Sequence, residues 1–251
     1  MESWGVIVLG RGPAALRAAI SAADAGSNPI IIDSGSVGSG SGTAPLSGLA
    51  ASASETSPAS HIEDTISAGG EKTNKEAAAR ICDQAVTTLA ELERWGLVLR
   101  REDSELPHLS DVEGHSVPRL AGCGDSTMRE VTRILEEQAI KRGITRRTDM
   151  LPISLVMDNN QTRGIIALDV ESGEVIGIQA KAVVLATDGY QGIWSDPANG
   201  AGTGAAISAD SGISLRGMEN VPMHALTVSG TDLTIPMGVL GSGGRIRMES
   251  G

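Results

Sequence analysis

The amino-acid sequence predicts an α/β fold in which a parallel sheet carries helices on its faces and a β-meander is inserted. Three observations predict this fold. The first 33 residues have the order strand, helix, strand; two helices with N-terminal capping signals come next; and three apolar segments separated by turn residues lie between residues 153 and 187. We find no internal repeat.

The first unit of the fold is a strand, a helix and a second strand. The apolar run Trp4–Leu9 is typical of a buried strand, and the small residues of Ala14–Ala25 indicate a helix. Gly26 follows this helix, where the absence of a side chain suits a helix C-terminus. "PIIID" (Pro29–Asp33) is the second strand. A strand–helix–strand connection of this length predicts parallel neighbouring strands.

Two helices are predicted in the middle of the chain. The first, "TNKEAAARICDQAVTTLAELERWG", opens with Thr73 and Glu76, and the second, "TMREVTRILEEQAIKRG", opens with Thr127 and Glu130. In each case a threonine stands three residues before a glutamate, which is the spacing of a capping box. We therefore expect Thr73 and Thr127 to cap these helices.

The remaining parts are a long loop and a meander. Ser34–Ser60 is rich in Gly, Ser and Ala with almost no charge, so it predicts a flexible loop that has a task of its own. Between Ile153 and Thr187 the turn-forming stretches "DNNQT" and "ESGE" separate three apolar segments, which indicates a β-meander whose last strand contains "AVVLAT".

Composition limits the classes of function. The chain has 251 residues, 40% of them hydrophobic, and a net charge of −11 with scattered basic residues, which disfavours nucleic acid as a partner. Cys82 and Cys123 lie far apart without metal-ligand spacing, so we expect buried thiols and neither a disulfide framework nor a metal site. The N-terminus has no basic leader, and no apolar run approaches 18 residues, so we expect a cytoplasmic protein without membrane insertion.

The turn after the first strand carries the clearest functional signal. Gly10, Gly12 and Ala15 fit the pattern G-x-G-x-x-A, in which the first glycine allows the tight turn, the second lets backbone approach a pyrophosphate, and the third lets helix and strand pack closely. Asp33 ends the second strand, where a carboxylate accepts hydrogen bonds from ribose hydroxyls. The arrangement predicts a dinucleotide site; a purely structural turn is the alternative.

The segments after Asp33 favour FAD over a nicotinamide dinucleotide. A nicotinamide-binding domain continues with further strand–helix–strand units, whereas this chain enters a Gly/Ser loop and inserts helices and a meander before "VVLATDG" (Val183–Gly189). The fold class is therefore a Rossmann-like FAD-binding domain. The alternative for "VVLATDG" is a buried strand that simply ends in a loop.

Several further stretches, taken in order, resemble one known family. The chain is similar to the flavoprotein subunit family of succinate dehydrogenase and fumarate reductase, which includes L-aspartate oxidase. The resemblance runs nearly end to end and implies hydride transfer between a dicarboxylate and FAD. It rests on the first turn and on "SHIEDTISAG" (60–69), "GHSVPR" (114–119), "DSTMRE" (125–130), "GIIALDVESGEV" (164–175), "KAVVLATDG" (181–189) and "MENVPMH" (218–224).

The resemblance implies a set of cofactor and substrate contacts. His224 falls on the family's histidine for the substrate carboxylate, although a buried histidine bonded to backbone is the alternative. Thr203 stands where the family has an acid in a Gly-Asp-Gly motif. The implied cofactor contacts are Gly10, Gly12, Pro13, Ala14, Ala15, Asp33 and Ser34 for the pyrophosphate and ribose; Ser41, Gly42, Thr43, Ser47 and Gly48 for the loop beside the flavin; and Ala186, Thr187, Gly189 and Thr203 near the last strand.

Other polar residues have two open interpretations. His61 and Asp64 are expected to cap or stabilise their own helix. His115 and Arg119 lie in a loop rich in turn residues, where packing or surface positions compete with an active-site lining. We assign none of them as catalytic.

The sequence departs from the family where the chemistry should be. Pro236 and Met237 stand where the family has a Thr-Glu pair, and neither side chain replaces those donors and acceptors. Asp188 replaces a family glycine. We expect residues 1–251 to be the FAD-binding domain, with about 225–251 leading to a capping domain, and we expect that capping domain and the C-terminal return segment to be absent from the chain.

The same comparison predicts that FAD is held non-covalently. Family members that attach FAD use a histidine before a threonine in the loop after the second strand. Here Gly42 precedes Thr43, and no histidine occurs before His61. Hydroxyl groups without an adjacent base are poor nucleophiles at neutral pH. An attachment through another histidine is the alternative.

Two functions from different classes remain. One is an FAD-dependent oxidoreductase, complete only with a second polypeptide that supplies the cap or with an iron–sulfur electron-transfer subunit, and peripheral to a membrane through such partners. The other is a non-catalytic dinucleotide-binding module. An enzyme resembling L-aspartate oxidase is a variant of the first.

Overall fold

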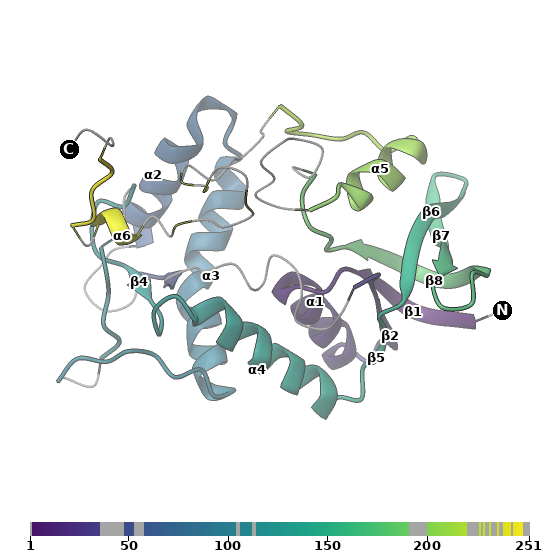
Figure 1. Ribbon diagram of the computed structural model, residues 1–251, viewed down its shortest axis with the longest axis horizontal. Helices are drawn as coiled ribbons and strands as arrows, with labels where there is room; N and C mark the ends of the chain where they lie inside the picture. Colours follow the sequence, from purple (N-terminus) through teal and green to yellow (C-terminus); the bar gives the residue numbers. More distant parts are fainter. Residues whose placement is uncertain are drawn as a thin grey trace. The chain divides into compact units, whose positions relative to one another are not determined.

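The computed structural model divides the chain into two compact units (Figure 1). Unit 1 comprises Met1–Ala44 and Leu135–Thr227, and unit 2 comprises Pro45–Ile134 and Val228–Gly251. The structure describes residues 2–35, 48–52, 58–103, 106–111, 114–190, 200–219, 226, 228, 231, 235, 238–241 and 243–247.

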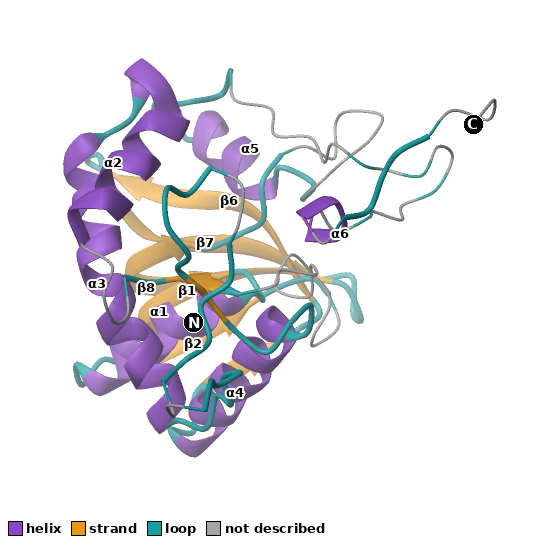
Figure 2. Cartoon of the chain, turned by 90° about the vertical axis from the view of Figure 1, so that its left-hand side faces the viewer, coloured by secondary structure: helices purple, strands orange, loops and turns teal. Residues whose placement is uncertain are grey.

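Unit 1 contains a six-stranded sheet with the strand order β5-β2-β1-β8-β7-β6. Figure 2 shows β2, β1, β8, β7 and β6 following one another in this sheet. β1 pairs in parallel with β2 and β8, and β2 pairs in parallel with β5. β6, β7 and β8 pair antiparallel through two hairpins. The strands are β1 (Glu2–Leu9), β2 (Pro29–Ile32), β5 (Thr145–Arg147), β6 (Met150–Asp158), β7 (Gln161–Asp169) and β8 (Val175–Leu185).

The predicted parallel sheet and meander are therefore confirmed, and the meander continues the parallel sheet as part of one sheet. The last meander strand, β8, lies beside β1 in a register that pairs Ile7 with Val183 and Leu9 with Leu185. The strand β5 was not predicted, because "TRR" is short and polar and becomes a strand only by pairing with β2.

Helix α1 (Pro13–Asp24) packs on β1 and β2. Its buried face consists of small and aliphatic side chains, among them Ala15, Leu16 and Ile20. Pro13 occupies the first turn, where its missing N–H has no intrahelical partner to lose. The helix begins and ends one residue earlier than predicted. Gly26 follows it with φ +76°, a conformation that favours glycine.

The core of unit 1 is aliphatic, as a chain without phenylalanine requires. Ile7, Leu9, Ile30 and Ile32 from the parallel strands meet Ile165 from the meander, all with no exposed surface. Helix α5 (Thr203–Asp210) contacts β6 and contributes to the same core. This packing fixes the strand ends around which the candidate site is built.

Unit 2 is mainly helical. It contains α2 (Pro58–Gly69), a short 3₁₀ helix η2 (Gly70–Lys72), α3 (Lys75–Arg94) and α6 (Gly238–Gly241), together with the antiparallel pair β3 (Leu49–Ala50) and β4 (Leu120–Ala121). α2 packs against α3. The fourth long helix, α4 (Thr127–Lys141), begins in this unit, and its residues from Leu135 onward belong to unit 1.

Both helix N-termini lie near the predicted positions, but both capping boxes are wrong. The cap of α3 is Asn74, whose Oδ1 accepts the N–H of Ala77 at 3.0 Å. Thr127 is the first residue of α4, and its hydroxyl accepts the N–H of Cys123 and donates to the carbonyl of Gly124. In both segments a second polar residue next to the threonine offered an equally good cap, so spacing could not choose between them.

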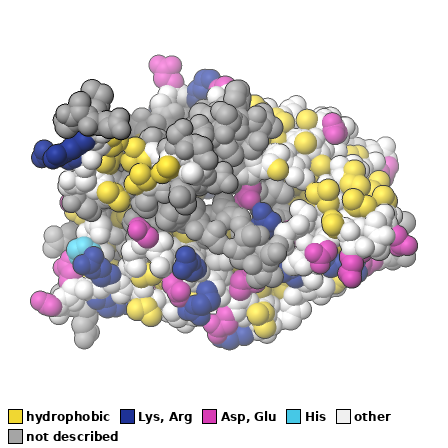
Figure 3. Space-filling model, in the orientation of Figure 1, with side chains coloured by type: hydrophobic (Ala, Val, Ile, Leu, Met, Phe, Trp, Pro, Cys, Tyr) yellow, Lys and Arg dark blue, Asp and Glu magenta, His cyan; other side chains and the backbone are white. Residues whose placement is uncertain are grey.

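The thiols and the helices bear on two other expectations. Cys82 is buried beside the Thr65 hydroxyl, but Cys123 is only half-buried, so the expectation of two buried thiols is wrong for Cys123. Among the described residues, no helix combines the length and apolar composition needed to span a bilayer. On the face drawn in Figure 3, Lys and Arg side chains are interspersed with Asp and Glu.

Candidate dinucleotide-binding site

The turn between β1 and α1 is fixed by a close approach of backbone. Gly10 has φ +136°, its N–H donates to the carbonyl of Ile32 at 3.0 Å, and a Cβ at this position would lie 2.1 Å from the carbonyl oxygen of Ala186. The N–H of Ala186 donates to the carbonyl of Leu9 at 2.8 Å. Only glycine therefore fits between the ends of β1 and β8.

The next glycine opens the helix. Gly12 is the N-cap of α1, with extended backbone (φ −86°, ψ −177°) and no side chain to accept from the first-turn N–H groups. Those N–H groups have no intrahelical partner, and the helix dipole adds positive potential at the same end. Ala15 is fully buried one turn later, which lets α1 pack closely on the sheet. The N-terminus of α1 is thus suited to an anion such as a pyrophosphate.

Asp33 follows directly after β2 and is 95% buried. Its Oδ1 accepts the N–H of Gly35 at 2.9 Å, and its Oδ2 accepts from Nη2 of Arg146 at 3.3 Å. Burial raises the pKa of Asp33, while the Gly35 N–H and the Arg146 charge act in the opposite direction. The carboxylate is therefore held at a defined place beside the turn.

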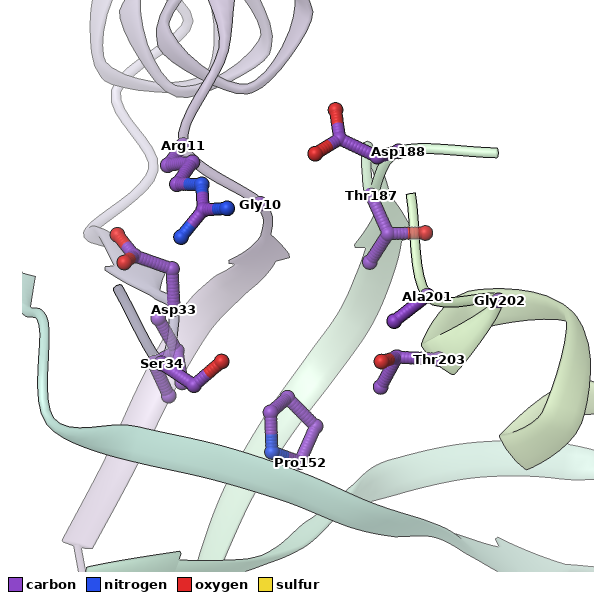
Figure 4. Close-up of a pocket in the computed structure, with 11 residues that line it drawn as sticks. Gly10, Arg11, Asp33, Ser34, Pro152, Thr187, Asp188, Ala201, Gly202 and Thr203 are labelled. Atoms are coloured by element: carbon purple, nitrogen blue, oxygen red, sulfur yellow. The ribbon is translucent and has the colours of Figure 1, made fainter. Parts of the chain in front are cut away.

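These elements border a cleft of about 110 Å³. Figure 4 shows Asp33 and Ser34 on one side of it and Thr187, Asp188 and Thr203 on the other. It lies at the C-terminal ends of the parallel strands, where ligands bind in open α/β sheets. The lining residues are Gly10, Arg11, Ile32, Asp33, Ser34, Pro152, Thr187, Asp188, Ala201, Gly202 and Thr203.

The far wall of the cleft is built by glycines that bring α5 against the segment after β8. The N–H of Gly202 donates to the carbonyl of Gly189 at 3.0 Å. A Cβ on Gly200 would lie 2.0 Å from that same carbonyl, and a Cβ on Gly204 would lie 2.1 Å from the Thr187 hydroxyl. This close packing positions Thr203 at the start of α5 beside Thr187.

The structure brings five of the predicted cofactor residues together in this cleft: Gly10, Asp33, Ser34, Thr187 and Thr203. The other predicted residues that the structure describes in unit 1 lie in the turn, in α1 and after β8: Gly12, Pro13, Ala14, Ala15, Ala186 and Gly189. Those that lie outside the described residues are Ser41, Gly42, Thr43, Ser47 and His224.

Gly48 is described in unit 2, where a Cβ would lie 2.6 Å from the carbonyl oxygen of Ala121 in β4. Close packing against β4 therefore requires glycine at position 48, whether or not the residue contacts a cofactor.

Several lining residues of the cleft were not predicted from the sequence. Arg11 lies between the two motif glycines, and its charge could have marked it as a partner for phosphate. Pro152 and Ala201 gave no signal, because they reach the cleft only through the pairing of β6 with β7 and the packing of α5 on β6.

A polar cluster in unit 2 contains the four residues whose roles the sequence left open: His61, Asp64, His115 and Arg119. Arg119 has no exposed surface; its Nη1 donates to Asp64 Oδ2 and to His115 Nδ1 at 3.0 Å. The N–H and hydroxyl of Ser116 also donate to Asp64, both at 2.8 Å. The Ser116 N–H, with Arg119 and the Ser116 hydroxyl, lowers the pKa of Asp64 to about 2.

This cluster ties the segment before β4 to α2. Burial and the Arg119 charge lower the pKa values of His61 and His115, whose rings lie 6.0 Å apart. The contacts give Arg119 a packing role, and they show Asp64 stabilising its helix by a tertiary contact rather than by capping.

Comparisons with known proteins agree with the interpretation of this cleft as a dinucleotide site. The family model described as FAD binding domain matches residues 5–251. An uncharacterized FAD-dependent oxidoreductase of Methanocaldococcus jannaschii is 32% identical over 95% of this chain and 45% of its own length. One chain of the fumarate reductase (CoM/CoB) of Methanothermobacter marburgensis is 30% identical over 87% of this chain and 42% of its own length.

Solved structures show that this chain resembles such proteins in fold as well as in sequence. A quinol fumarate reductase chain of E. coli has a TM-score of 0.90 at 25% identity, covering 97% of this chain and 43% of that one. A chain of the Mycobacterium smegmatis Sdh1 complex has a TM-score of 0.78 at 27% identity, covering 84% of this chain and 39% of that one. The chain thus spans less than half the length of these relatives.

Proposed function

We propose that the cleft of unit 1 holds the adenosine diphosphate half of FAD without a covalent bond, because the chain belongs to the FAD binding domain family. The observation that carries this proposal is the N-terminus of α1, which follows the tight turn at Gly10 and whose first N–H groups no side chain caps, so that they are open to an anion.

The residues present fit this group. The N–H groups at the start of α1 are suited to the pyrophosphate, and the ionised Asp33 carboxylate is suited to ribose hydroxyls. Arg11 adds a positive charge at the cleft. Ser34, Thr187 and Thr203 offer further hydroxyl groups. FAD would supply the hydride acceptor.

For the complete protein we propose transfer of hydride between a dicarboxylate and FAD. The resemblance to fumarate reductase and succinate dehydrogenase flavoproteins supports this, with His224 as donor to a substrate carboxylate and Ser41, Gly42, Thr43, Ser47 and Gly48 beside the flavin. Pro236 and Met237 offer no donors or acceptors in the place of the family's Thr-Glu pair. We therefore propose that the reaction needs groups from outside these 251 residues.

We propose further that residues 1–251 form one FAD-binding domain with 225–251 leading toward a capping domain. A second polypeptide or an iron–sulfur subunit would then complete the enzyme; two relatives are named as subunits, one of a fumarate reductase (CoM/CoB) and one of an 8-methylmenaquinol:fumarate reductase. The substitutions at Pro236 and Met237 favour, as a second candidate, a dinucleotide-binding module without catalysis.

Titration of the purified chain with FAD, ADP and NAD tests the cofactor. We expect FAD and ADP to bind and Gly12→Val to abolish both, because a branched side chain at the helix N-terminus blocks the pyrophosphate. Gly177→Val is the matched control, since Gly177 is exposed on β8 with open space around its Cβ position. Tight binding of NAD without FAD would overturn the assignment.

A further inference from the structure

Three charged side chains form a line of ion pairs beside the cleft, inside unit 1. Nε and Nη2 of Arg146 lie 3.4 and 3.3 Å from Asp33 Oδ2, and Nη1 of Arg146 lies 2.5 Å from Glu136 Oε1. The side chains of Asp33, Arg146 and Glu136 are 5%, 14% and 20% exposed. They come from three elements: the end of β2, the strand β5 and the helix α4.

The backbone holds this line in place. Ile31 and Arg146 are partners in the parallel ladder between β2 and β5. The N–H of Asp33 donates to the carbonyl of Arg147, and the carbonyl of Asp33 accepts the N–H of Met150, both at 3.0 Å. With Gly35 on Oδ1 and Arg146 on Oδ2, both carboxylate oxygens are directed by fixed donors. The orientation of Asp33 is therefore set by its neighbours before any ligand arrives.

The charges explain why a guanidinium is needed. A carboxylate that receives hydrogen bonds from ribose hydroxyls must be ionised, because a protonated carboxyl donates with one of its oxygens. Burial acts against ionisation of Asp33. Arg146 offsets this, together with Arg11 from the turn. Glu136 binds the other side of Arg146 and keeps that guanidinium beside Asp33; Arg146 itself does not line the cleft.

We propose that Arg146, held by Glu136, is a positioning residue that keeps the Asp33 carboxylate ionised and aimed at the cleft, so that the site selects a ribose with free vicinal hydroxyls. This rests on the proposed function, because it assumes that the cleft takes the adenosine end of a dinucleotide. A ribose carrying a 2′-phosphate is rejected, since that phosphate meets a buried carboxylate whose own cation is already engaged on both sides.

Binding of ADP to the full chain, measured by calorimetry from pH 5 to pH 8, tests the proposal. We expect Arg146→Met to weaken ADP binding about tenfold at pH 7. Below pH 7, ADP affinity should fall as the pH decreases, and this fall should begin at a higher pH in Arg146→Met than in the wild type. Burial raises the Asp33 pKa, and in the variant the Arg146 charge no longer opposes that increase. Arg146→Lys should restore part of the affinity by returning the charge. 2′,5′-ADP, which differs from AMP only by a phosphate on the 2′-hydroxyl, should bind the wild type less tightly than AMP; equal or tighter binding overturns the selection of a free ribose.

The matched control is Arg163→Met, which removes an exposed arginine paired with Asp158 on the β6–β7 hairpin and should leave ADP binding unchanged. In an Asp33→Asn background, Arg146→Met should cause no further loss, because Arg146 acts through Asp33. An equal loss in that background overturns the proposal, as does wild-type affinity with a wild-type pH profile in Arg146→Met.

Other outcomes separate this proposal from the function on which it rests. If Arg146→Met does not fold, Arg146→Gln decides in its place, because it also removes the charge: unchanged affinity and pH profile overturn the positioning role. If the wild type binds neither ADP nor FAD, the proposed function and this inference both fall. If the wild type binds both and only the Arg146 result fails, the FAD site stands without the positioning role.

Discussion

Replacing Gly10 by alanine tests the packing that closes the turn. The added Cβ would lie 2.1 Å from the Ala186 carbonyl oxygen, so the two atoms must separate by about 0.9 Å to reach 3.0 Å, the shortest approach that real Cβ atoms make. The neighbour is backbone and cannot rotate away. Separation therefore strains the ladder in which the Ala186 N–H donates to Leu9.

The expected cost is about 3 kcal/mol. The positive φ contributes roughly 1 kcal/mol, loss of one strand hydrogen bond about 1 kcal/mol, and overpacking about 1 kcal/mol. Gly26→Ala is the matched control, because Gly26 also has a positive φ (+76°) but no atom within 4 Å of its Cβ position. That variant should lose only the roughly 1 kcal/mol that comes from the backbone.

Urea unfolding followed by circular dichroism measures the difference. With a slope of about 2 kcal/mol per molar urea, Gly10→Ala should unfold about 1 M below Gly26→Ala. FAD binding should be lost in Gly10→Ala as well, since the turn moves. Equal midpoints for the two variants would refute the argument that the approach of β8 requires glycine at position 10.

Three further predictions concern the polar cluster and the cofactor. Arg119→Met should lower the urea midpoint, because it removes a fully buried guanidinium that donates to Asp64, His115 and Ser60; stability equal to the wild type would contradict this. The pKa of Asp64 is lowered to about 2, so its contribution to stability is present above about pH 4 and is lost as the pH falls through about 2; the urea midpoint should drop over that range, and less steeply in Asp64→Asn. Acid precipitation of FAD-loaded protein should leave the flavin in the supernatant, whereas fluorescence on the denatured band in a gel would reveal a covalent bond.

Much of the fold of unit 1 was predictable because its signals are local. Periodicity marked β1, α1 and β2, and turn residues marked the meander. The pairing of β8 with β1 was not predictable, because more than 150 residues separate the two strands and the sequence of neither strand indicates its partner. Short strands such as β5 are defined by pairing alone, so their three residues carry no pattern.

The candidate site divides in the same way. Gly10 and Asp33 were predictable because the sequence pattern indicates the turn after β1 and the end of β2, where these residues lie. Arg146 was not predictable, because it lies 113 residues from Asp33 in the sequence and its neighbours in the sequence do not distinguish it from a surface arginine. Asn74 shows the limit at closer range: it stands beside Thr73, and only the backbone path decides which of the two accepts the helix N–H.

The two motif glycines, Gly10 and Gly12, are needed for different reasons, although the sequence pattern does not distinguish them. Gly10 is required by protein backbone, because Ala186 occupies the space of a side chain. Gly12 has extended backbone that any residue adopts, so its conformation does not require glycine. We therefore expect the requirement for glycine at position 12 to come mainly from what approaches the N-terminus of α1. Gly12→Val should lose only the roughly 1 kcal/mol by which valine is a poorer N-cap than glycine, so it should unfold about 0.5 M urea below the wild type and above Gly10→Ala, and yet fail to bind FAD; if it destabilises the protein as much as Gly10→Ala, the second glycine is structural, and the turn alone gives no argument for a pyrophosphate.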